Sequence, residues 1–110
     1  MELHELQQRV KNFLQKKGWD NPSSENKYYT LIHFMEELGE FSRELLYTED
    51  NRKPSKEREG GSLQEELADV FYHVLKLSVL YDLNLEEIFS KKMTKIEERF
   101  LSENDEDQTL

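Results

Sequence analysis

Residues 62–81 read SLQEELADVFYHVLKLSVLY, and this segment is the most apolar part of the 110-residue chain. Its apolar residues recur at three- and four-residue steps and cover most of a helix circumference, which predicts a central, largely buried helix. Ser62 and Glu65 form a capping box, because each side chain is placed to accept a hydrogen bond from a free backbone N–H at the helix start. Two acids, Glu66 and Asp69, lie three residues apart within this otherwise apolar helix.

Three further segments have helical periodicity, over about residues 3–17, 25–47 and 85–100, and none shows the strict alternation of a half-buried strand. Gly18 offers a stop for the first of them, and Asn84 caps the last. We therefore predict an all-α fold, a compact four-helix domain over residues 1–101. The polar segment 48–61 is predicted to be a mobile loop, and the acidic segment 102–110 a disordered tail.

The charge balance excludes several classes of partner. Asp and Glu number 24 against 15 Lys and Arg, which gives a net charge of −9. An acidic surface repels phosphate backbones and anionic lipids, so we expect no nucleic-acid and no membrane partner. The absence of cysteine excludes disulfides, thiolate catalysis and Cys-ligated zinc, and a cytoplasmic location is the default expectation. The acidic N-terminus and the lack of a long apolar run predict a soluble chain without a signal peptide.

Four carboxylates form two pairs on the second and third predicted helices. Glu37 precedes Glu40 by three residues, as Glu66 precedes Asp69, so each pair shares one helical face. Such like charges repel unless a cation lies between them, and four converging carboxylates would suit Mg²⁺ or Mn²⁺. The competing interpretation is a solvated acidic face. The apolar surroundings of the second pair, and Gly39 in mid-helix between two acids, favour the metal.

The segments Glu36-Glu37-Leu38-Gly39-Glu40 and Glu66-Leu67-Ala68-Asp69 together resemble the EExxE…ExxD signature of the MazG-like, all-α nucleoside triphosphate pyrophosphohydrolases. The resemblance covers most of the chain, from the N-terminal helix to Arg99. It implies an oligomeric helical bundle, a homodimer or dimer of dimers, that hydrolyses nucleoside triphosphates to monophosphate and pyrophosphate in nucleotide-pool house-cleaning. It further implies that Mg²⁺, or Mn²⁺, is held by Glu37, Glu40, Glu66 and Asp69. Glu36 and Glu37 would be the catalytic residues, with Glu36 in an auxiliary or water-orienting role.

The fourth predicted helix carries basic residues that can balance a triphosphate. Lys92, Lys95 and Arg99 share one face, and the resemblance implies that they meet phosphates. The alternative is that they form surface ion pairs with glutamates of their own helix. Ile96 stands where dCTP-hydrolysing relatives often have Asn, so that substrate preference does not carry over.

Two aromatic and two histidine side chains complete the candidate site. Trp19 follows the first helix, where similar enzymes keep an aromatic near the base, and it is either a stacking platform or a hydrophobic anchor. Tyr72 is placed either to touch sugar or phosphate, or to pack. His33 and His73 lie four residues from Glu37 and Asp69, and we expect them to pack or to support the metal ligands.

Two rival functions remain open at the level of sequence. A phosphoribosyl-ATP pyrophosphohydrolase would use similar metal chemistry on another substrate. A non-catalytic helical dimerisation module would use its acids only to bind cations or a basic partner. The lean hydrophobic content of 35% supports self-association under each of these functions.

Overall fold

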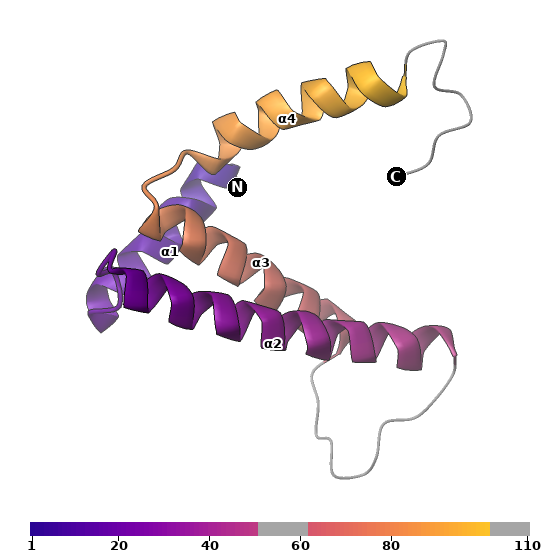
Figure 1. Ribbon diagram of the computed structural model, residues 1–110, viewed down its shortest axis with the longest axis horizontal. Helices are drawn as coiled ribbons and strands as arrows, with labels where there is room; N and C mark the ends of the chain where they lie inside the picture. Colours follow the sequence, from indigo (N-terminus) through magenta and orange to yellow (C-terminus); the bar gives the residue numbers. More distant parts are fainter. Residues whose placement is uncertain (51–61, 102–110) are drawn as a thin grey trace.

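The computed structural model describes residues 1–50 and 62–101, which form four α-helices without a strand (Figure 1). The all-α prediction is confirmed for this part of the chain. No described helix combines the length and the apolar character that a membrane crossing needs. Most of the predicted loop over 48–61, and the predicted tail over 102–110, lie outside the described residues. The helices are α1 (Leu3–Lys17), α2 (Ser24–Glu49), α3 (Leu63–Leu80) and α4 (Leu85–Phe100).

The predicted helix ends are built by the residues that the sequence indicated. Gly18 ends α1 with a left-handed backbone, at φ 73°. The Ser62 hydroxyl accepts a hydrogen bond from the Glu65 amide at 3.2 Å at the start of α3. The Asn84 side chain accepts one from the Glu87 amide at 3.1 Å at the start of α4. These caps fix where α3 and α4 begin.

Helix α2 is longer than predicted at its C-terminal end. It continues past Tyr47 to Glu49, so the loop predicted from Thr48 begins later. The Thr48 hydroxyl donates to the Glu44 carbonyl at 2.8 Å, which satisfies this hydroxyl within the helix. The loop was predicted to begin at Thr48 because this last turn of the helix is polar.

Helix α3 is the central element, as predicted. It runs antiparallel along α2 and also packs against α1, whereas α4 packs mainly against α1 (Figure 1). The fully apolar core is small, because only Leu14, Leu75 and Leu80 are buried among the described apolar residues. Leu14 comes from α1, and Leu75 and Leu80 come from α3, which packs against α1.

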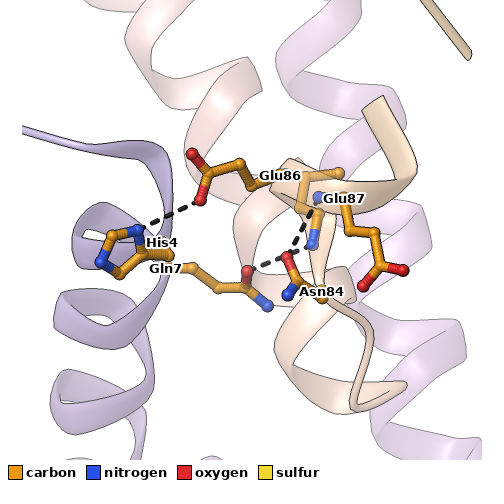
Figure 2. Close-up of polar contacts among 6 residues, drawn as sticks. His4, Gln7, Asn84, Glu86 and Glu87 are labelled. Carbon is orange, nitrogen blue, oxygen red and sulfur yellow. Dashed lines mark hydrogen bonds and ion pairs between the residues drawn. The ribbon is translucent and has the colours of Figure 1, made fainter. Parts of the chain in front are cut away.

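The domain is less compact than expected, because α4 extends from the other three helices as an arm (Figure 1). The radius of gyration is 17.3 Å, compared with about 13 Å for a compact domain of 100 residues. The arm is anchored at its base (Figure 2). The Gln7 amide donates to the Leu83 carbonyl and accepts from the Leu85 N–H, and His4 lies 3.1 Å from Glu86. Polar contacts with α1 therefore hold the start of α4.

The apolar residues that recur at three- and four-residue steps along α2, here called the α2 stripe, do not form its buried face. Thr30 and Glu44 are the buried residues of α2, so the helix turns a mixed face towards α3 and leaves apolar residues outside. An atom added at the Cβ position of Gly39 would meet nothing within 4 Å, so no part of the described chain approaches this glycine closely. The exposed apolar residues of the stripe are Tyr28, Leu31, Ile32, Met35, Leu38 and Leu45.

Candidate metal site

Three glutamates converge where α2 and α3 pack side by side. Glu37 and Glu40 come from α2 and Glu66 from α3, and one carboxylate oxygen of each lies within 4.8 Å of the others. The three-residue spacing places the α2 pair on one face, and the antiparallel packing brings Glu66 opposite it. The convergence of acids from both predicted pairs is thus present in the fold.

The cluster is partly withdrawn from water, and two of its oxygens lack a hydrogen-bond partner in the described part of the chain. Glu66 is 7% exposed, and the Oε2 atoms of Glu37 and Glu66 are buried without a hydrogen-bond partner among the described residues. Burial, and then repulsion from Glu40 and Glu37, raise the pKa of Glu66 from 4.5 to about 7. Burial, and then repulsion from Glu40, also raise the pKa of Glu37. Neutral pH therefore forces charge into a site that disfavours it.

Asp69 and Glu36 lie beside this cluster rather than within it. Asp69 is exposed, and its oxygens are outside the group of three. Its charge nevertheless contributes to the raised pKa values of Glu37 and Glu66. Glu36 is exposed and lies 3.5 Å from the His33 ring nitrogen. The structure thus brings together three of the four predicted ligands and keeps Asp69 within electrostatic reach.

The carboxylate cluster fits a hard divalent cation. Its donors are all oxygen, which Mg²⁺ and Mn²⁺ prefer. Two of the potential ligand oxygens are buried without a hydrogen-bond partner among the described residues. Such atoms lower the stability of the fold unless a cation binds them. A purely solvated acidic face would not bury Glu66, so the fold favours the metal interpretation over the surface one.

The raised pKa of Glu66 makes stability depend on pH. Between about pH 4.5 and pH 7 the folded chain keeps a proton on Glu66 that the unfolded chain has lost, so the free energy of unfolding falls as pH rises. We expect the melting temperature of the metal-free protein to be lower at about pH 8 than at about pH 5. We expect Mg²⁺ to raise it more at the higher pH, since metal ligands must be deprotonated. Thermal unfolding at both pH values, with and without Mg²⁺, measures both effects.

Glu66→Gln is the control variant, because it removes the one carboxyl group whose pKa is raised to about 7 and leaves the other ionisable groups in place. This variant should lose most of the pH dependence and most of the Mg²⁺ effect. A wild-type melting temperature that stays level across this pH range, or a Glu66→Gln profile that matches it, would contradict the prediction.

A chain of ring contacts joins Trp19 to α3. Phe13 meets the Trp19 ring edge-on at 5.8 Å and the Tyr72 ring at 6.4 Å. Tyr72 in turn contacts the ring of His73 at 5.1 Å, and burial raises the pKa of the Tyr72 hydroxyl. Tyr72 therefore has packing contacts, and Trp19 is held towards α3 while the residue stays 48% exposed.

The two histidines near the acids make packing and hydrogen-bonding contacts. The Nδ1 atom of His73 lies 2.8 Å from the Asp69 carbonyl, and its ring meets Phe34 of α2 at 6.2 Å. His33 stacks edge-on with Tyr29 at 4.3 Å. Neither histidine is in the group of potential metal ligands among the described residues.

The basic residues predicted to bind phosphate stand on the α4 arm. Lys92, Lys95 and Arg99 are exposed, and α4 packs mainly against α1 rather than against the helices that carry the carboxylates. Within one chain, the structure does not bring these three side chains to the acid cluster. Lys91 pairs with Glu87 at 3.1 Å, so ion pairing within α4 occurs at a neighbouring position.

One residue that sequence reasoning did not single out is Lys76. It is a lysine in the apolar helix α3 that is only 9% exposed, and its Nζ atom lies 5.9 Å from the centre of the Trp19 ring. The signal was available, because Lys76 is the only basic residue of the 63–80 segment other than His73. The role of Lys76 depends on its position beside Trp19, and the sequence alone does not predict that the two residues are close.

A comparison with protein families matches residues 26–100 to the MazG nucleotide pyrophosphohydrolase domain. The match starts after Trp19, so α1 and this tryptophan lie outside it. No curated protein and no solved structure matches the chain. The matched segment covers more than half of the chain and contains the whole carboxylate cluster, and the chain therefore belongs to the MazG nucleotide pyrophosphohydrolase domain family.

Proposed function

We propose that the chain hydrolyses nucleoside or deoxynucleoside triphosphates to the monophosphate and pyrophosphate with the help of Mg²⁺. The observation that carries this proposal is the partly buried carboxylate cluster inside a MazG domain, in which two oxygens have no hydrogen-bond partner among the described residues. When bound, Mg²⁺ neutralises triphosphate charge and lowers the pKa of a bound water. A role in cleaning the nucleotide pool, in the cytoplasm, is part of the same proposal.

The chain's own residues divide the work in this proposal. Glu37, Glu40 and Glu66 hold the metal, and Asp69 completes the set from its exposed position. Glu36 accepts a hydrogen bond from the attacking water and orients it, and the bond between the α- and β-phosphates breaks. No side chain becomes covalently attached to substrate, which fits a chain without cysteine. Trp19 stacks on the base, and Tyr72 borders the sugar or phosphates.

The proposal also includes assembly of two or more copies. The α2 residues at positions 28, 32, 35, 39, 42 and 46 follow steps of four and three, the spacing of a helix-pairing seam. Gly39 and Ser42 in the middle of this seam are small, so a second helix can approach closely. The α4 arm also exposes Phe89 and Ile88. In such an assembly, Lys92, Lys95 and Arg99 contact the phosphates of substrate bound to a neighbouring copy.

Measuring pyrophosphate release tests the proposed reaction. The substrates are a panel of ribo- and deoxyribonucleoside triphosphates together with phosphoribosyl-ATP, each with Mg²⁺, with Mn²⁺ and with a chelator. We expect equal amounts of monophosphate and pyrophosphate from the triphosphates, only with metal. Hydrolysis of phosphoribosyl-ATP alone would replace the proposal by its first rival. No hydrolysis of any substrate by a folded, metal-loaded protein would favour a dimerisation module.

A further inference from the structure

Lys76 is a buried cation that the proposed chemistry does not use. It lies in α3, 9% exposed, and makes no hydrogen bond or ion pair with any described residue. Burial lowers the pKa of its ammonium group. A lysine in this position costs stability that an apolar residue would not, and its one recorded partner is the face of the Trp19 ring.

Lys76 lies on the same side of α3 as Asp69. The two are seven residues apart, which is two helical turns, or about 10 Å along the axis towards the C-terminal end. Trp19 reaches this level of α3 from the connection between α1 and α2. The carboxylates and the Lys76–Trp19 pair thus mark two separate positions along one helix. The proposed function places the phosphates of the substrate at the first position and its base at the second.

The surroundings of Trp19 leave room for a planar ligand. Phe13 meets the indole at an interplanar angle of 84°, the Lys76 ammonium lies over the ring, and Trp19 stays 48% exposed. Lys17 approaches the ring at 5.7 Å, but it is exposed and free to move aside. A shallow cavity of about 280 Å³ adjoins the ring and is lined by Trp19, Asn26 and Tyr29 among others. The Asn26 amide donates to the Trp19 carbonyl at 3.0 Å and fixes the loop.

We infer that Lys76 recognises the nucleobase, by donating a hydrogen bond to a ring carbonyl oxygen of the base that stacks on Trp19. An ammonium group has donors only, so its partner on a base must be an acceptor, and a ring carbonyl oxygen is a strong one that adenine lacks. Uracil, thymine, cytosine, guanine and hypoxanthine carry such an oxygen, and adenine does not. The chain therefore prefers nucleotides with a carbonyl-bearing base over adenine nucleotides. This inference rests on the proposed function, because it places the base of the same substrate.

Fluorescence of Trp19, the only tryptophan of the chain, reports base binding directly. The probes are UMP, GMP and AMP without metal, so that no hydrolysis is involved. We expect wild type to bind UMP and GMP more tightly than AMP. Lys76→Met keeps the length and the apolar stem of the side chain and removes its charge. It should weaken the binding of UMP and GMP by about 10- to 100-fold and change the affinity for AMP by less than about threefold. Lys17→Met is the matched control, and it should keep the wild-type preference.

A second comparison needs no variant, which covers the case in which Lys76→Met does not fold. Inosine monophosphate and purine riboside monophosphate differ by one carbonyl oxygen, and calorimetry on wild type should show the first binding about 10-fold more tightly or better. Equal affinity for this pair, an equal loss for all three nucleotides in Lys76→Met, or no binding of any monophosphate would overturn the inference. Failure of the proposed function is separate, because it would appear as absent pyrophosphate release while the base preference persisted.

Discussion

Replacing Glu66 by Gln is expected to abolish metal-dependent pyrophosphate release and, at the same time, to stabilise the metal-free protein. Gln keeps the shape of the side chain but removes the negative charge of a carboxylate whose oxygen lies within 4.8 Å of an oxygen of Glu37 and of Glu40. Loss of a metal ligand should lower kcat/KM by at least about a thousandfold, or ~4 kcal/mol of transition-state stabilisation. Without metal, the same change removes a buried charge whose pKa is raised to about 7. The melting temperature at about pH 8 should therefore rise by a few degrees.

A substitution that lowers activity but raises the melting temperature indicates a carboxylate that serves function rather than stability. Activity is measured with saturating Mg²⁺ and stability by thermal unfolding in a chelator. Glu65→Gln is the matched control, because Glu65 precedes Glu66 on α3, is exposed and lies outside the cluster. This variant should keep activity and melting temperature close to wild type. If Glu66→Gln retained activity within about tenfold, or were destabilised instead, the carboxylates would not be the metal site.

The helices and the acid cluster were accessible to sequence reasoning because they depend on local rules. Ser62 and Asn84 act as caps through side chains three residues from the amides they bind, and Gly18 ends α1 through its own backbone freedom. Predicting the convergence of Glu37, Glu40 and Glu66 also required the antiparallel pairing of α2 with α3. The matching three-residue spacing of the acids on both helices indicated that pairing.

Other features depend on how whole helices pack, and the sequence pattern did not determine them. Helix α2 carries apolar residues around much of its circumference, so periodicity could not tell which face meets α3. Thr30 and Glu44 are buried there while Ile32 and Met35 are exposed. The direction of α4 is set by contacts such as that of Gln7 with the turn before it, which no local pattern predicts. The distance between the α4 basic residues and the carboxylates follows from that direction.

Replacing Ile32 by Glu is expected to convert the assembly to monomers. Ile32 is 56% exposed in the single chain, and it lies in the α2 seam between Tyr28 and Met35. Burial of an unpaired charge at an interface costs about 3–5 kcal/mol, and a twofold interface contains the substitution twice. The dissociation constant should therefore rise by at least about a thousandfold. Light scattering at micromolar concentration should give 13.3 kDa for the variant and at least twice that mass for wild type.

Two companion variants show whether the seam itself is responsible. Tyr29 is 59% exposed on the same helix, about a quarter turn from the seam, so Tyr29→Glu adds the same charge at matched exposure and should leave the assembly intact. Ile32→Leu keeps the apolar contact and should do the same. If wild type were already monomeric, the exposed apolar face of α2 would need another partner, and the proposed assembly would be wrong. Ile32→Glu could instead be monomeric and inactive while still binding Mg²⁺, because the metal site lies within one chain. This loss of activity would show that substrate binding needs the neighbouring copy. The basic residues of α4 that stand away from their own carboxylates would then act on the site of that neighbour.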